Sequence, residues 1–273
     1  MYKLIACDLD GTLIKSDRTI SEENIKSIKE ANDAGVLFVP TSGRGFLSIQ
    51  VTAKALGVFN KKNQYIISYN GGVITENYQN KILLMKDMDH QVAEKLYEEG
   101  LKRNLTIHVY TLDQVYIYHL SKEEKEFLNG RISYIEGSWQ NLNFLKDQKI
   151  LKILYENTNY EFLKKISEEL SITLPYLAMS FSSKRYLEFN PENVTKGAGL
   201  VYLADYLHIP IEETIAIGDS LNDLSMIEKA GLGVGVNNAS YDLVPHCDFI
   251  TKNDYNHSAI KEVIDRFIFN KGN

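Results

Sequence analysis

The chain has 273 residues, of which 44% are hydrophobic and 24% are charged. This length and composition are typical of a folded globular protein and exclude a minidomain or a disordered chain. The net charge of −6 argues against the broad basic surface of a nucleic-acid-binding protein. No apolar run reaches membrane-spanning length and Asp8 interrupts the first apolar segment, so we expect neither a membrane span nor a signal peptide.

The two cysteines give a weak indication of the compartment. Cys7 and Cys247 have neither CxxC nor zinc-type spacing. A reducing cytoplasm therefore fits better than an oxidising compartment. The sequence carries no signal for an oligomeric state.

Predicted strands and helices alternate at both ends of the chain. In the first part, strands are predicted at 4–7, 36–39 and 65–68, with helices from Ser21 to Gly35 and from 46 to 56. In the last part, a helix spans 200–207, TIAIG is a strand, LNDLSMIEKAG is a helix, and GVGV and DFI are further strands. This alternation predicts an α/β fold with a doubly wound parallel sheet.

The middle of the chain has a different pattern. LTIHVY-TLDQ-VYIYH is typical of a β-hairpin, and KILKILYE followed by NYEFLKKISEEL indicates a strand and then a helix. We therefore expect an inserted α+β domain, with the chain leaving the parallel sheet after Gly72 and returning near Asn190. The predicted division is a core of residues 1–82 and 188–273 and an inserted domain of residues 83–187.

Polar groups follow the predicted strands of the core, where open parallel sheets bind their ligands. They are Asp8 and Asp10 in DLDGT, Thr41 and Ser42 in TSGR, and Asp219, Asn222 and Asp223 in GDSLND, with Lys196 in TKG at a predicted helix start. If these loops converge, carboxylates crowd one site, and two unit charges about 4 Å apart repel by roughly 4 kcal/mol at an effective dielectric of about 20. Carboxylate oxygens without His or Cys favour Mg²⁺, and Lys196 supplies a second positive charge.

The same groups indicate phosphoryl chemistry. Thr41, Ser42 and Gly43 precede a predicted helix and offer hydroxyl and N–H groups to phosphate oxygens. Asp8 is then placed to attack phosphorus as a carboxylate nucleophile, while Asp10 protonates the leaving oxygen and later activates water. Each motif alone is more often structural, and it is their joint occurrence that predicts a site.

Taken in order, these motifs resemble those of the haloacid dehalogenase-like superfamily, in particular its Cof-type phosphatases, some of which act on sugar phosphates. The resemblance covers nearly the whole chain. It implies a Rossmann-like core and an inserted α+β cap that closes over the site and selects the leaving group. The implied activity is Mg²⁺-dependent hydrolysis of a small phosphorylated metabolite through an aspartyl-phosphate intermediate.

The resemblance also implies roles for individual residues. The implied catalytic residues are Asp8 as nucleophile, Asp10 as general acid and base, Thr41 and Lys196. The implied metal ligands are Asp8, Asp10 through its backbone carbonyl, Asp219 and, in support, Asp223. The implied phosphate- or substrate-binding residues are Thr41, Ser42, Gly43, Arg44, Asn70, Lys196, Asn222 and Asn238.

Three alternatives remain beside hydrolysis. A phosphomutase of the same superfamily would use the same core residues, and a non-catalytic phosphometabolite-binding protein would need no second carboxylate such as Asp10. GDSL at Ser220, with Asp254 and His257 forming a downstream DxxH, matches the spelling of a serine esterase signature. In that family, however, the serine block lies far earlier in the chain. We assign no role to Asp254 or His257, and the substrate cannot be read from the sequence.

Overall fold

The structure is a computed structural model that describes residues 1–271. The chain divides into two compact units, one formed by Met1–Met85 and Thr195–Asn273 and the other by Lys86–Val194. The first is called the core and the second the cap. Each unit has its own sheet and hydrophobic interior.

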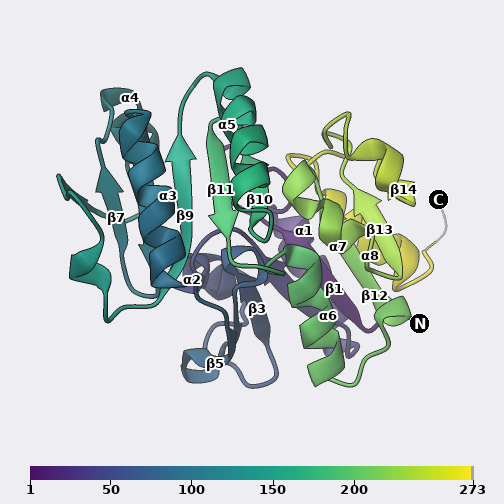
Figure 1. The fold of residues 1–273 in the computed structure, drawn as a ribbon. Helices are drawn as coiled ribbons and strands as arrows, with labels where there is room; N and C mark the ends of the chain where they lie inside the picture. The colour runs from purple at the N-terminus through teal and green to yellow at the C-terminus, as the bar shows by residue number, and fades with distance from the viewer. Residues whose placement is uncertain (272–273) are drawn as a thin grey trace. The chain divides into compact units, whose positions relative to one another are not determined.

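An eight-stranded sheet organises the core, in the order β14-β13-β12-β1-β2-β3-β4-β5 (Figure 1). Its strands are β1 (Leu4–Asp8), β2 (Leu37–Thr41), β3 (Tyr65–Ser68), β4 (Val73–Glu76), β5 (Lys81–Met85), β12 (Thr214–Gly218), β13 (Leu232–Gly235) and β14 (Phe249–Ile250). The strands from β14 to β3 are parallel, and β1 lies between β2 and β12. Segments from the two ends of the chain therefore lie side by side, as the purple and green strands of Figure 1 show.

The central strands are short apolar runs because both faces of the sheet are covered. Leu4 and Ala6 pack with Leu200 and Leu203 of the helix that carries Lys196. Successive side chains of a strand point to opposite faces. All five residues of β1 are buried, so neither face is open to solvent there.

Within residues 1–271, five α-helices belong to the core. They are α1 (Glu22–Asp33), α2 (Phe46–Ala55), α6 (Lys196–Tyr206), α7 (Leu224–Ile227) and α8 (Ala259–Phe267). Ser21 caps α1 as expected, since its hydroxyl accepts the Asn24 N–H at 3.1 Å. The helix predicted over LNDLSMIEKAG is much shorter, because a 3₁₀ turn, η5 (Leu221–Asp223), replaces its start and the chain must reverse before β13.

The chain does not leave the core after Gly72, contrary to the sequence prediction. It passes through a 3₁₀ turn, η1 (Tyr69–Gly71), and then adds β4 antiparallel to β3 and β5 antiparallel to β4 at the edge of the sheet. The predicted parallel sheet therefore has an antiparallel edge. This addition is favourable because β3 would otherwise leave unpaired backbone groups at the sheet edge.

The cap contains a six-stranded sheet in the order β10-β11-β9-β6-β7-β8. Its elements are α3 (His90–Lys102), β6 (Thr106–Thr111), β7 (Val115–Tyr118), α4 (Lys122–Leu128), β8 (Ile135–Gly137), β9 (Ile150–Glu156), α5 (Tyr160–Thr173), β10 (Ala178–Ser182) and β11 (Tyr186–Asn190). The predicted hairpin is β6–β7, and α3 and α5 pack on one face of the sheet through residues such as Leu96 and Ile166. Within residues 1–271, no helix combines the length and apolar character needed to cross a bilayer.

Candidate active site

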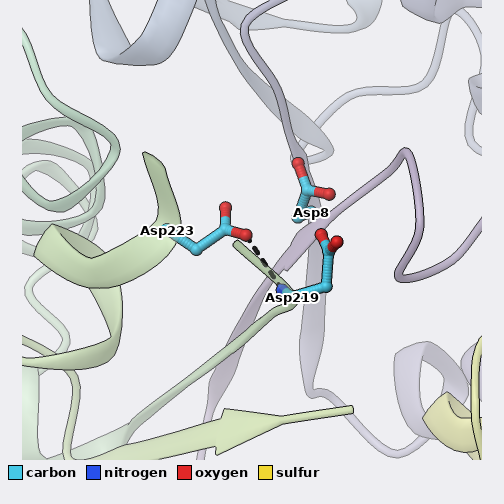
Figure 2. A group of neighbouring side chains, drawn as sticks. All are labelled: Asp8, Asp219 and Asp223. Carbon is cyan, nitrogen blue, oxygen red and sulfur yellow. Dashed lines mark hydrogen bonds between the residues drawn. The ribbon is translucent and has the colours of Figure 1, made fainter. Parts of the chain in front are cut away.

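Three aspartates meet at the carboxyl ends of neighbouring core strands. Asp8 is the last residue of β1, and Asp219 directly follows β12, which pairs with β1 in parallel. Together with Asp223, each offers a carboxylate oxygen, and these oxygens lie within 4.8 Å of one another. Figure 2 shows the Asp8 and Asp219 carboxylates facing each other. Such a group of hard oxygen donors can hold a divalent cation.

The turn after β12 is held in shape by Asp223. Its Oδ2 atom accepts the backbone N–H groups of Asp219 at 3.0 Å and Ser220 at 3.1 Å. The first of these bonds is the dashed line in Figure 2. The other oxygen of Asp223 remains directed at Lys196. Asp223 therefore both shapes the turn and joins the charged cluster.

Lys196 is the buried cation of the cluster. Its side chain is fully buried, and its Nζ lies 2.6 Å from Asp8 Oδ1 and 2.5 Å from Asp223 Oδ1. Burial opposes its charge, but the Asp223 and Asp8 carboxylates outweigh that effect and hold the pKa of Lys196 above its ordinary value. Lys196 therefore stays protonated and keeps its positive charge inside the cluster.

The carboxylates themselves are short of positive charge. Burial raises the pKa of Asp8, and the Asp223 and Asp219 charges add to the rise, although Lys196 opposes it. Burial and the neighbouring Asp223 raise the pKa of Asp219 to about 7. One ammonium group for three carboxylates, two of them buried and one partly buried, leaves negative charge uncompensated, so this donor set fits a divalent cation.

The loop after β2 borders the same end of the sheet. Thr41 pairs with Asp8 in the β1–β2 register, and its hydroxyl donates to the Val39 carbonyl at 3.2 Å. The Ser42 hydroxyl accepts the Arg44 N–H at 3.2 Å. Arg44 also forms an ion pair with Asp10. Asp10 is half exposed, unlike buried Asp8 two residues earlier, so the two carboxylates have different surroundings.

The three predicted asparagines occupy separate turns at this edge. Asn222 Oδ1 accepts the Ser220 hydroxyl at 2.8 Å. Asn238 Nδ2 donates to the Gly11 carbonyl at 2.8 Å, which ties the DLDGT loop to the segment after β13. Asn70 is buried, and its N–H donates to the Ser42 carbonyl at 3.1 Å. The structure thus gathers the sequence-predicted site residues at one end of the core sheet.

Two further residues act here that were not singled out from the sequence. The Thr12 hydroxyl donates to Asp219 Oδ1 at 3.2 Å and so orients a member of the acidic cluster. The Ser225 hydroxyl accepts the Gly197 N–H at 3.0 Å, which holds the start of α6 beside the turn of Asp223. Thr12 lies inside the DLDGT motif, so its position was the available signal, whereas nothing in the sequence marks Ser225.

The geometry does not support the serine esterase hypothesis. The Ser220 hydroxyl bonds within its own turn, and exposed His257 pairs with Asp254 at 2.7 Å. Among residues 1–271, no hydrogen bond joins Ser220 to His257. A serine nucleophile needs a base within hydrogen-bonding reach.

Comparison with known proteins defines the class. Residues 5–264 match the haloacid dehalogenase-like hydrolase family, so the chain belongs to that family. This confirms the resemblance, the core–cap fold class and the prediction that the protein is an enzyme of the phosphatase type.

Particular relatives are phosphatases. The chain is 30% identical over 263 residues to 5-amino-6-(5-phospho-D-ribitylamino)uracil phosphatase YcsE of Bacillus subtilis, covering 96% of this chain and 94% of that protein. It is 31% identical to a second Bacillus subtilis 5-amino-6-(5-phospho-D-ribitylamino)uracil phosphatase, YwtE, and the match covers 94% of this chain and 96% of that protein.

Solved structures agree on the fold. A haloacid dehalogenase-like hydrolase from Bacteroides thetaiotaomicron is 30% identical and superposes with a TM-score of 0.80, covering 97% of this chain and 99% of the other. The subclass IIB sugar phosphatase BT4131 superposes with a TM-score of 0.85 over 97% of this chain and 98% of that one. At 16% identity, this likeness is evidence for the fold of this chain alone.

Proposed function

We propose that this enzyme hydrolyses small phosphomonoesters with the aid of Mg²⁺, through an aspartyl-phosphate formed on Asp8. The observation that carries this proposal is the cluster of Asp8, Asp219 and Asp223 around the buried Lys196. A carboxylate nucleophile must approach a phosphate that is itself negative. The cluster therefore needs both a lysine and a metal cation, and it has the lysine and the donor set for the metal.

Asp8, Asp219 and the backbone carbonyl of Asp10 would hold the metal, with Asp223 in support. When bound, Mg²⁺ supplies positive charge that offsets the charge of the transferring phosphoryl group and its leaving oxygen. Lys196 contributes the same kind of stabilisation from the protein side, through its contact with Asp8. The surroundings of Asp219 suit a cation ligand, because burial and the neighbouring Asp223 charge raise its pKa to about 7 and a bound cation would offset both effects.

In the proposed reaction, an Asp8 carboxylate oxygen attacks phosphorus, and the bond from phosphorus to the leaving oxygen breaks. Asp10 gives a proton to that oxygen and then takes one from the water that hydrolyses the aspartyl-phosphate. Its exposure suits a group that meets water and the leaving group in turn. Thr41, Ser42 and Gly43 would hold the phosphate oxygens.

Four further residues are proposed at the border of the phosphate and substrate site: Arg44, Asn70, Asn222 and Asn238. We propose that the cap, predicted as residues 83–187, selects the leaving group. The substrate class we favour is a sugar phosphate or related phosphometabolite.

The two free thiols, Cys7 and Cys247, support the proposal that the protein works in a reducing cytoplasm.

A substrate panel tests this proposal. Purified enzyme is assayed for phosphate release from hexose phosphates, phosphorylated polyols, pyridoxal phosphate, flavin mononucleotide and 5-amino-6-(5-phospho-D-ribitylamino)uracil, with Mg²⁺ and with excess chelator. We expect metal-dependent release that is absent from Asp8→Asn protein. Full activity in excess chelator would exclude the metal role.

Product analysis separates the alternatives. Free phosphate in stoichiometric yield supports hydrolysis, whereas an isomerised sugar phosphate would indicate a phosphomutase. Tight binding of a phosphometabolite without turnover would indicate a binding protein, and cleavage of carboxylic esters would indicate an esterase.

A further inference from the structure

The turn between β3 and β4 has an unusual backbone. Three consecutive residues of η1 lie in the left-handed region, with φ angles of 49° at Tyr69, 54° at Asn70 and 94° at Gly71. Non-glycine residues with positive φ are uncommon, and two in succession with a bulky tyrosine among them are disfavoured sterically. All three residues are buried. Such a conformation persists only where the surroundings hold it in place, and it is often found beside functional sites.

The first two residues of the turn hold the loop after β2. The Tyr69 N–H donates to the Arg44 carbonyl at 3.0 Å, and the Asn70 N–H donates to the Ser42 carbonyl at 3.1 Å. The Asn70 side chain also lies against the backbone of this loop, because a Cβ atom placed on Gly43 would be 2.9 Å from Asn70 Oδ1. The left-handed backbone therefore directs successive N–H groups into the loop proposed to bind phosphate.

The third residue holds the start of α6. A Cβ atom on Gly71 would lie 2.3 Å from the Thr195 carbonyl oxygen, far inside contact distance. Thr195 is the N-cap of α6, since its hydroxyl accepts the Ala198 N–H at 3.1 Å, and Lys196 follows directly. From the helix side, a Cβ on Gly199 would be 3.0 Å from Gly71 Cα. The turn and the helix can meet only because both positions lack a side chain.

We propose that the left-handed turn Tyr69–Gly71 is a positioning element that sets Lys196 relative to the loop Ser42–Arg44. This proposal rests on the phosphatase function proposed above. The turn contacts both segments through its backbone, and it lies outside the acidic cluster itself. A shift of α6 away from the turn would move the lysine ammonium off Asp8 and away from the phosphoryl group. Gly71 is thus a positioning residue that acts through Thr195 and Lys196.

The test uses Gly71→Ala with Gly35→Ala as the matched control. Gly35 has a similar left-handed φ of 87°, but a Cβ placed there meets nothing within 4 Å. Both variants therefore impose a left-handed alanine on the core, and only Gly71→Ala also displaces the start of α6. We expect kcat of Gly71→Ala to fall by about tenfold or more with KM changed by less than about twofold, because a misplaced lysine weakens transition-state stabilisation. Gly35→Ala should retain wild-type kcat.

Two further variants keep the test decisive. Gly199→Ala gains helix propensity, and its methyl group would crowd Gly71 Cα at 3.0 Å and Ile67 Cγ2 at 2.9 Å, so it should fold and show a smaller fall in kcat even where Gly71→Ala does not fold. In a Lys196→Met background, Gly71→Ala should reduce kcat less than it does in the wild type, since the two changes act on one interaction.

The outcomes separate the two proposals. A folded Gly71→Ala enzyme with kcat within about twofold of Gly35→Ala would overturn the positioning role, and so would full additivity with Lys196→Met. Where Gly71→Ala does not fold, wild-type kcat in Gly199→Ala would overturn it. A wild-type enzyme that releases no phosphate from any ester in Mg²⁺ would instead overturn the proposed function, and the positioning role with it.

Discussion

Lys196→Met is the change that most directly probes the electrostatic account of the site. Methionine has nearly the same length as lysine but no charge, so the substitution removes the ammonium group with little change in packing. Two buried carboxylate oxygens, 2.6 Å and 2.5 Å from Nζ, then lose their partner. Removing one member of a buried ion pair costs about 3–5 kcal/mol, because the remaining charge stays desolvated.

We therefore expect Lys196→Met to lower the free energy of unfolding by about 3–5 kcal/mol in excess chelator at pH 7.5. The loss should shrink toward pH 5, because Asp8 and Asp219, whose pKa values are raised, take up protons and no longer need the lysine. Added Mg²⁺ should recover part of the loss, since the cation replaces the missing positive charge.

Urea denaturation gives the free energies, and Lys3→Met is the matched control. Lys3 also forms an ion pair, at 2.7 Å with Glu213, but both side chains are partly exposed, so its loss should cost less than about 1 kcal/mol. Phosphate release should fall steeply in Lys196→Met, to a residual rate that is still measurable, and should be unchanged in Lys3→Met. A Lys196→Met protein as stable as Lys3→Met in chelator, with wild-type turnover, would refute the reasoning.

Three other predictions concern the same molecule. Asp8→Asn should abolish turnover and Asp10→Asn should strongly depress it, with both near-ultraviolet circular dichroism spectra unchanged; near-normal rates in folded Asp8→Asn protein would refute the nucleophile assignment. Because the pKa of Asp219 is about 7, its proton must leave when a cation binds at lower pH. The Mg²⁺ affinity measured by calorimetry should therefore fall about tenfold from pH 8 to pH 6. An affinity that does not change with pH would contradict the assignment of Asp219 as a metal ligand. Burial, with the charges of Lys152 and Arg185, lowers the pKa of His108 to about 3, so this residue is neutral when folded and protonates on unfolding as the pH falls below about 6.5. The contribution of neutral His108 to the free energy of unfolding is complete at pH 8 and about 2 kcal/mol smaller at pH 5. The difference in free energy of unfolding between wild type and His108→Gln, measured by urea denaturation, should therefore change by that amount between the two pH values. A difference that stays constant would contradict the lowered pKa of His108.

The sequence was sufficient for features that depend on local pattern. The strand Tyr65–Ser68 is a buried apolar run and was predicted with its observed bounds, and the Ser21 cap was predicted from a polar residue before an acidic first turn. The convergence of Asp8 and Asp219 followed from a general property of parallel sheets, whose ligands lie beyond the carboxyl ends of their strands.

Features set by long-range contacts were not readable in the same way. No strand was predicted between residues 73 and 85, because nothing local says that this segment pairs back onto β3. The ion pair of Asp10 with Arg44 joins loops of two strands. The left-handed backbone at Tyr69 contradicts local propensity and is held by contacts with distant segments.

The central claim is that Asp8 accepts the phosphoryl group, and chemical trapping tests it most directly. Enzyme turning over a good substrate in Mg²⁺ is quenched with acid, treated with borohydride to reduce any acyl phosphate, digested and analysed by mass spectrometry. We expect that Asp8, and no other carboxylate, is converted to homoserine, and that the conversion needs both substrate and metal. Conversion at another aspartate, or a phosphoryl group found on Ser220, would contradict it.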